Sequence, residues 1–281
     1  MKVLLAVTAI LTASLVWTAN QAAVRLSSRV ILPADVSPAD HVRSRLFREL
    51  RPVRLSNCVL ERFGEPTDGG YLMCGNLLRY SQAAYSYGIN GYDGWGCDIA
   101  TRLASTTHQY DCFNVVVPIC ATGRTVFHPL CVAGAERSDE QGRRFESLSK
   151  QIADNGDRLR RLVVKMDVEG AEWETLLRTP NETLRRVDQL VLELHGVDEE
   201  RFIVVVQKLK RIFHVAHLHI NNYSCGEKYR PFPGWAYEVL LVNKRLARRL
   251  PGPVVSPHPL DRPNYPDSPD CQPRSAGPRP P

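Results

Sequence analysis

Apolar runs alternate with amphipathic stretches along most of this chain of 281 residues. The first apolar run, 84–91, predicts a buried strand that opens into a glycine-rich loop. The other runs that predict buried strands are 108–111, 125–133, 161–168, 187–195, 213–220 and 236–242. The stretches with the apolar spacing of helices are 34–50, 97–105, 142–153, 171–177 and 199–212. This alternation predicts an α/β fold, with a mostly parallel seven-stranded sheet and helices on both faces. No clear helix joins the last two strands, so one of them is free to run antiparallel.

Composition divides the chain into four segments. Residues 1–23 have a basic start, a short apolar stretch and small residues at their end, which predicts a secretory signal peptide. A short membrane anchor over residues 3–17 is the alternative. Residues 24–80 hold a lead-in helix and strand, and residues 81–248 hold the α/β domain. Residues 249–281 are rich in proline and are expected to be extended or disordered.

Charge and cysteine content narrow the class of protein. The net charge of +6 lies mostly on predicted helix faces, and no zinc-finger spacing is present, so we expect no nucleic-acid partner. Eight cysteines favour an oxidising compartment, which predicts the secretory pathway or the extracellular space. Disulfides are expected, but their pairing does not follow from spacing, and several cysteines are equally compatible with buried thiols. Beyond the N-terminal segment, no stable membrane insertion is expected.

A glycine-rich loop follows the first predicted strand of the α/β domain. Gly88 and Gly91 allow a backbone to approach a nucleotide or nucleoside closely. Asp111 closes the next strand about twenty residues later, where a carboxylate can accept both ribose hydroxyl groups. An ordinary surface turn is the alternative interpretation of the glycine loop, and a helix-capping or turn aspartate is the alternative interpretation of Asp111.

Two later strands end in acidic residues and a histidine. Asp167 and Glu169 follow the strand 161–168, while Glu193 and His195 end the strand 187–195. Parallel neighbours would bring these groups to one edge of the sheet, where open α/β sheets bind their ligands. There they could act as general bases or hold a divalent metal through Asp167, Glu193 and His195. The alternative is that the acids near Glu169 only cap the following helix.

A third group of polar residues lies on one later strand. Alternation places His217, His219 and Asn221 on the same face of the strand 213–220 and its end. A single histidine in such a position is usually structural. The triplet favours the wall of a polar pocket.

The segment Lys165-Met-Asp167-Val-Glu169-Gly-Ala-Glu172 resembles the signature of FkbM-type S-adenosylmethionine-dependent methyltransferases. Weaker resemblances to a related methyltransferase-like branch cover Asp68-Gly-Gly, Tyr85-Ser-Tyr-Gly88 and Val191-Leu-Glu193-Leu-His195. The resemblance implies a Rossmann-like class I methyltransferase fold and O-methylation of a hydroxyl group. The acceptor would be a sugar, another glycan, a lipid or a small metabolite.

The same resemblance implies roles for individual residues. S-adenosyl-L-methionine would lie over Gly88 and Gly91, with Asp111 on its ribose. The usual acid before the first glycine is absent, so Asp98 or Asp93 would replace it near the methionine ammonium. Asp167 and Glu169 would face the site of methyl transfer, with His195 or Asp167 as base. Two alternatives stay open: a dinucleotide-binding oxidoreductase, disfavoured by the glycine spacing, and a secreted module that keeps the fold without turnover.

Overall fold

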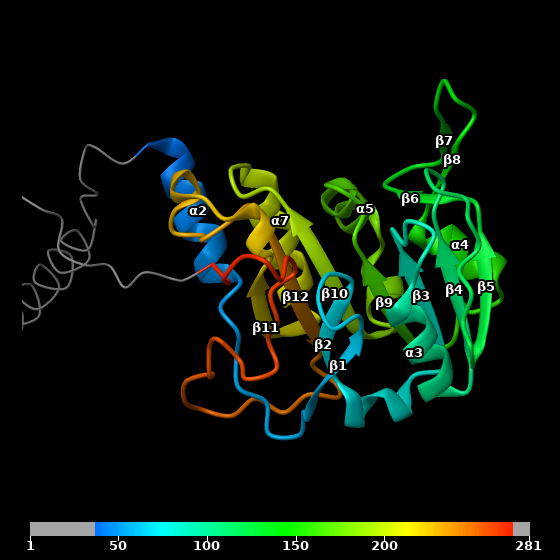
Figure 1. Cartoon of the computed structure of the whole chain (residues 1–281), viewed down its shortest axis with the longest axis horizontal. Helices are drawn as coiled ribbons and strands as arrows, with labels where there is room; N and C mark the ends of the chain where they lie inside the picture. Colours follow the sequence, from blue (N-terminus) through cyan, green and yellow to red (C-terminus); the bar gives the residue numbers. More distant parts are fainter. Residues whose placement is uncertain (1–36, 272–281) are drawn as a thin grey trace, which may run out of the picture. The chain divides into compact units, whose positions relative to one another are not determined.

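The computed structural model describes residues 37–271, so the predicted signal peptide and the last ten residues lie outside the described part. Its centre is a seven-stranded sheet in the order β11-β12-β10-β9-β3-β4-β5 (Figure 1). These strands are β3 (Ala83–Tyr87), β4 (Thr106–Tyr110), β5 (Arg124–His128), β9 (Leu162–Met166), β10 (Val187–His195), β11 (Phe213–Ile220) and β12 (Ala236–Asn243). β12 is antiparallel to both neighbours, and the other neighbouring pairs are parallel. The predicted mostly parallel α/β sheet is therefore confirmed.

Different elements cover the two faces of the sheet. One face packs against four helices and a short helical turn, because the apolar sides of these elements share a core with alternate strand residues. They are α2 (Pro38–Glu49), α4 (Leu148–Asp154), α5 (Ala171–Arg178), α6 (Asn181–Leu184) and α7 (Glu200–Lys210). The opposite core contains residues of α3 (Gly94–Leu103), of the hairpin β1 (Leu60–Gly64) and β2 (Gly70–Cys74), and of η1 (Gly75–Tyr80). On this second face the hairpin covers β10 and β12.

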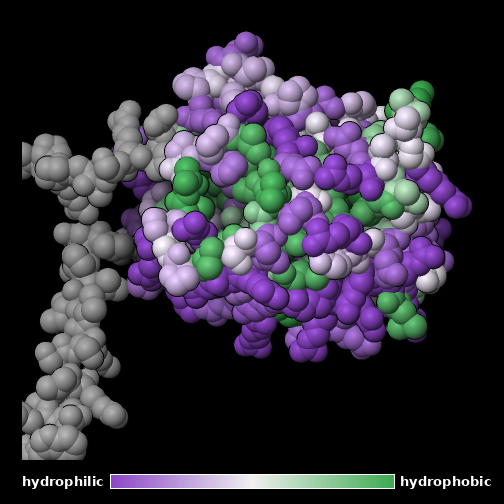
Figure 2. All heavy atoms as spheres, turned by 90° about the horizontal axis from the view of Figure 1, so that it is seen from below, coloured by the Kyte–Doolittle hydropathy of each residue, from purple (hydrophilic) through white to green (hydrophobic). Residues whose placement is uncertain are grey.

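The face of the molecule seen in Figure 2 is mainly hydrophilic. Figure 2 shows apolar side chains in small separate groups on one face of the molecule, surrounded by polar residues. Within residues 37–271, no helix is both long and apolar enough to cross a membrane.

The direction of the sheet connections reverses between β3 and β9, which are adjacent parallel strands. In open α/β sheets, such a switch point is where ligands bind beyond the carboxyl ends of the strands. Gly88, directly after β3, has φ +73°, and a Cβ atom on it would lie 1.5 Å from the carbonyl oxygen of Asp167. Glycine is therefore required where the two strand ends meet.

Two predicted elements differ from the structure. The strand expected over 125–133 is two strands, β5 and β6 (Cys131–Ala133), because Pro129 between them has no N–H for a continuous ladder. The helix expected over 142–153 is also wrong at its start. Residues 144–147 form β8, which pairs with β6 and with β7 (Arg137–Ser138), and Ser147 caps α4 by accepting a hydrogen bond from Lys150 N.

All eight cysteines form disulfides, so the alternative of buried thiols is excluded. The pairs are Cys58–Cys74, Cys97–Cys120, Cys112–Cys131 and Cys225–Cys271. Four disulfides support the expected oxidising, secreted or extracellular environment. Residues 251–271 of the proline-rich tail form bends and turns without a helix or strand, and they pack on the domain. We call residues 258–271 the C-terminal strap.

Candidate functional site

Acidic groups from β9 and β10 meet at the switch edge of the sheet. Asp167 follows β9, while Glu193 and His195 end β10, and the two strands pair in parallel with Met166 opposite Leu192. One ligand atom from each of Asp167, Glu193 and His195 lies within 4.8 Å of the other two. The structure thus brings together all four residues that the sequence pattern suggested for chemistry at this edge, since Glu169 also lies beside His195.

Glu172, in the first turn of α5, holds His195 in place. This fully buried carboxylate accepts hydrogen bonds from Val168 N at 2.7 Å and Gly170 N at 2.8 Å, and its Oε1 lies 3.2 Å from His195 Nδ1. The other ring nitrogen, Nε2, faces Glu193 at 3.8 Å and Glu169 at 3.5 Å. Glu172 therefore both supports the loop before α5 and orients the imidazole. The sequence pattern suggested only helix capping for the acids near Glu169 and did not indicate that Glu172 orients His195.

The charges around His195 set its protonation. Burial lowers its pKa, but the hydrogen bond with Glu172 and the negative charges of Glu172, Glu193 and Asp167 outweigh burial and raise the pKa to about 9. The Glu169 side chain is 84% exposed, so this residue lies at the mouth of the site and not in its interior.

Glu193 is the buried carboxylate of the cluster. Burial, followed by the negative charges of Asp167 and Glu238, raises its pKa well above the ordinary value. Tyr71 O–H, from β2, donates to Asp167 Oδ2 at 3.1 Å, and Asn221 Nδ2 donates to Glu193 Oε1 at 2.8 Å. These donors offset part of the repulsion between the carboxylates.

The cluster opens into a cavity of about 440 Å³, which we call the acidic cavity. Its lining residues are Asp68, Asp167, Glu169, Glu193, His195, Asn221, Tyr223, Ser224, Trp235, Ala236, Asn264 and Tyr265. Four of them are acidic, and only His195 can carry a positive charge. A ligand of this cavity is therefore expected to bring positive charge or hydrogen-bond donors.

The predicted cofactor loop lies beside this cavity, on the other side of the switch point. Gly88 N donates to Tyr110 O at 3.1 Å, and Asp167 N donates to Tyr87 O at 3.2 Å, which joins the ends of β3, β4 and β9. Gly91, with φ +78°, leaves room for the Asn114 side chain, which a Cβ atom would meet at 2.9 Å. The loop residues do not line the acidic cavity.

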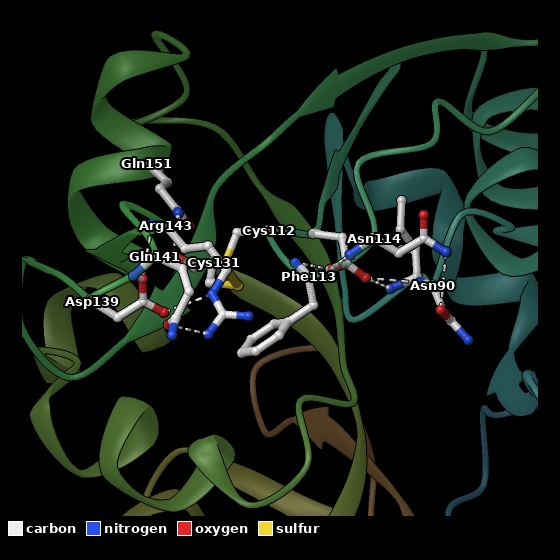
Figure 3. The surroundings of a disulfide bond; sticks show 11 residues. Asn90, Cys112, Phe113, Asn114, Cys131, Asp139, Gln141, Arg143 and Gln151 are labelled. Carbon is white, nitrogen blue, oxygen red and sulfur yellow. Dashed lines mark hydrogen bonds and ion pairs between the residues drawn. A yellow bond between two sulfur atoms is a disulfide. The ribbon is translucent and has the colours of Figure 1, made fainter.

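Asp111 braces the glycine loop through its carboxylate. Oδ2 accepts from Ile89 N at 3.2 Å and Asn90 N at 2.8 Å, and Oδ1 accepts from Phe113 N at 2.8 Å and Asn114 N at 3.0 Å. Figure 3 shows three of these donor residues, Asn90, Phe113 and Asn114, beside the Cys112–Cys131 disulfide. Both oxygens of Asp111 are thus engaged by backbone donors. The bonds from Phe113 and Asn114 match the alternative of a turn aspartate, whereas the bonds to the glycine loop were not indicated by the sequence pattern.

The two candidates for the missing acid lie in different places. Asp98 Oδ2 accepts from Gly64 N at 2.8 Å, at the β1 hairpin. Asp93 caps α3 and is 4% exposed; Oδ1 accepts from Gly96 N and Oδ2 from Gln109 Nε2. Burial raises the pKa of Asp93, although nearby Lys165 opposes the rise. Asp93, not Asp98, is therefore the candidate near Lys165, whose side chain bonds to the glycine loop.

Lys165 supplies the positive charge between the loop and the acidic cavity. Its buried Nζ donates to Gly88 O at 2.8 Å and lies 3.5 Å from Asp167 Oδ2. The sequence motif contained this lysine but did not indicate where its side chain points.

The chemistry of the cluster fits a divalent cation. Asp167 and Glu193 provide oxygen ligands and His195 provides a nitrogen ligand, a set that suits ions such as Mn²⁺ or Zn²⁺. Glu193 is 5% exposed beside another carboxylate, so a bound cation would relieve their repulsion. Glu172 would orient the histidine ligand from behind.

Comparison with known proteins gives no assignment. No protein-family profile, no curated protein and no solved structure matches this chain.

Proposed function

We propose that this chain is an S-adenosylmethionine-dependent methyltransferase that acts on a hydroxyl group. The observation that carries the proposal is the meeting of the Gly88 loop with Asp167, Glu193 and His195 at one switch point. The sheet, with its single antiparallel strand near one end, supports the class I methyltransferase fold that the sequence motif implies. The motif residues Lys165, Asp167 and Glu172 each make a side-chain hydrogen bond at this edge of the sheet. These hydrogen bonds support a role for the motif beyond packing.

The cofactor would lie over the glycine loop. Gly88 allows the close contact with the carbonyl oxygen of Asp167, Gly91 leaves room for the Asn114 side chain, and Asp111 holds the loop in one conformation. The carboxylate of Asp93 would stabilise the positive charge of the methionine moiety through the loop, in place of the absent acid before Gly88.

Methyl transfer needs an oxygen nucleophile held in line with the sulfonium methyl group. Asp167 or His195 would accept the hydroxyl proton, with His195 oriented by Glu172. Because its pKa is about 9, His195 is mostly protonated at neutral pH unless a bound cation lowers that pKa, so Asp167 is the better base without one. A divalent cation on Asp167, Glu193 and His195 would supply positive charge that makes a hydroxyl group easier to deprotonate.

Calorimetry tests the cofactor first. Saturable binding of S-adenosylmethionine, with no binding of NAD, is expected for the secreted full chain. Asp111→Ala should weaken that binding by about 1–3 kcal/mol, through lost ribose contacts or a loosened loop. Asp154→Ala serves as the control because its side chain is 57% exposed on α4. Binding of NAD alone would overturn the proposal, and an unchanged affinity of Asp111→Ala would refute the ribose role.

One observation favours a second candidate, a secreted module that binds without turnover. The four backbone donors on Asp111 occupy the oxygens that a ribose would use. Transfer of a labelled methyl group from S-adenosylmethionine to a panel of glycan, lipid and small-molecule acceptors separates the candidates. Cofactor binding without any labelled product would favour the second one.

A further inference from the structure

The sequence carries two Asn-x-Ser/Thr tripeptides, the acceptor pattern for N-linked glycans in eukaryotic secretory pathways. They are Asn181-Glu-Thr183 and Asn222-Tyr-Ser224, and neither has proline at its middle position. Four disulfides support a secreted chain, which passes through the compartment where such glycans are attached. Tripeptides of this kind are common by chance, so the surroundings of each asparagine decide whether it carries a glycan in the folded protein.

The Asn181 side chain has room for a glycan. Asn181 is the first residue of α6 and is exposed, as are its neighbours Pro180 and Glu182. Within residues 37–271, its side-chain amide makes no hydrogen bond. Leu184, at the other end of α6, is fully buried and anchors the helix without help from Asn181. A glycan on Asn181 Nδ2 would therefore break no side-chain contact.

The Asn222 side chain, by contrast, is used by the C-terminal strap. Asn222 is 5% exposed, and its Nδ2 donates to the carbonyl oxygens of Tyr265 at 2.8 Å and Ser268 at 2.9 Å. Its Oδ1 accepts from Tyr265 N at 2.8 Å. The hydroxyl group of Ser224, the third residue of this tripeptide, is buried and donates to Asn221 O at 2.7 Å. A glycan on Asn222 would replace one of the two amide hydrogens and fill the space of the strap.

The strap is held at other points as well, so it stays over Asn222. Asn264 Nδ2 donates to Asp68 Oδ1 at 3.0 Å, and the Cys225–Cys271 disulfide ties the end of the strap to the chain just after Asn222. Because glycan transfer precedes folding, a chain modified at Asn222 could not dock the strap afterwards. The folded protein therefore comes from chains in which Asn222 is unmodified.

Asn181 lies at the edge of the sheet opposite the candidate site. α6 leads into the start of β10, where Leu162 N, at the start of β9, donates to Arg186 O at 3.0 Å. The acidic cavity lies at the carboxyl ends of these two parallel strands. A glycan on Asn181 would leave the approach to the cavity open, whereas Asn222 directly precedes residues that line the cavity.

We propose that Asn181 is an N-glycosylation site and that Asn222, in spite of its matching tripeptide, stays unmodified in the folded protein. The donor is an oligosaccharide joined through a diphosphate to a membrane lipid. A bond forms between Asn181 Nδ2 and the anomeric carbon of the first sugar, and the bond from that carbon to the diphosphate oxygen breaks. The amide loses one proton, and the lipid diphosphate leaves with the electron pair of the broken bond. This inference is independent of the proposed methyltransferase function.

Peptide mapping of the full chain, secreted from a eukaryotic host, tests both parts of the inference. Peptide N-glycosidase F converts a glycosylated asparagine into aspartate, which mass spectrometry distinguishes from an unmodified asparagine. We expect conversion at Asn181 and none at Asn222 in the wild type, with the untreated protein as the control for spontaneous deamidation. This measurement needs no substitution, so it does not depend on the folding of a variant.

Substitutions within the first tripeptide test the same site by electrophoresis. Thr183→Ala removes the acceptor pattern but keeps Asn181, so the mobility shift on enzyme treatment should be lost. Thr183→Ser restores the pattern and should restore the shift. Glu182→Gln is the matched control, because it changes an exposed residue and leaves the pattern intact, so the shift should be retained.

The two parts of the inference fail separately. An unmodified Asn181 in the secreted wild type, or a shift that persists in Thr183→Ala, would overturn the assignment of Asn181. A glycan on Asn222 of the secreted protein would overturn the conclusion that the docked strap excludes it.

Discussion

Replacing Asp111 by asparagine tests how the candidate cofactor loop is held. The carboxylate accepts four backbone hydrogen bonds, two on each oxygen. An asparagine has one acceptor oxygen, so at best one pair of N–H groups stays bonded while the other pair faces an NH₂ group. The substitution changes the shape of the side chain very little, which isolates the effect of these hydrogen bonds.

The expected loss of stability follows from the number of bonds. A hydrogen bond to a charged group contributes about 1.5–3 kcal/mol, so losing two costs about 3–6 kcal/mol. Asp111 is 8% exposed, and water that reaches it offsets part of the loss, so we expect a value near the lower limit, about 3 kcal/mol. For a domain of this size, that corresponds to a fall in Tm of about 6–12 °C.

Differential scanning calorimetry of the disulfide-bonded protein measures this change. Asp154→Asn is the control, because its side chain is 57% exposed and its ion pair with Lys150 lies on the surface of α4. We expect its Tm to change by less than about 2 °C. If Asp111→Asn melted within 2 °C of the wild type, the four hydrogen bonds could not be the support of the loop.

Three further substitutions test the site and its surroundings. Gly88→Ala should prevent folding, because the new Cβ would overlap the carbonyl oxygen of Asp167. The expected readout is loss of secretion, and normal secretion would contradict the contact between the two strand ends. Glu172→Gln should lower the pKa of His195 from about 9, seen by NMR titration, since the substitution removes a negative charge; an unchanged pKa would exclude the contact. Burial opposes protonation of His219, but the buried Glu238 raises the pKa of His219 to about 9. The protonated histidine therefore stabilises the fold fully below pH 6.5, and this contribution is lost as the pH rises through 9. His219→Asn should therefore be less stable than the wild type by up to about 3 kcal/mol at pH 6 and nearly equal above pH 9, measured by urea unfolding; a constant difference would contradict this.

The pattern of apolar positions predicted the sheet well, because strand and helix periodicity are local properties of a sequence. The run over 187–195 became β10 with the same bounds, and 213–220 became β11. The convergence of Asp167 with Glu193 and His195 also followed from sequence, since adjacent parallel strands end at one edge. The helix predicted over 142–153 failed at its start because pairing with β6 and β7 outweighs the local helical spacing.

What the sequence alone determined was therefore the order and type of most elements, an oxidising environment suggested by eight cysteines, and the edge of the sheet where acids gather. Only the tertiary structure decided the four disulfide pairs, the use of Asp111 as a brace, and the place of Asn264 in the cavity wall. The physical reason is distance along the chain. Asn264 and Asp68 are 196 residues apart, and their contact depends on the path of the whole strap, which no local pattern of residues specifies.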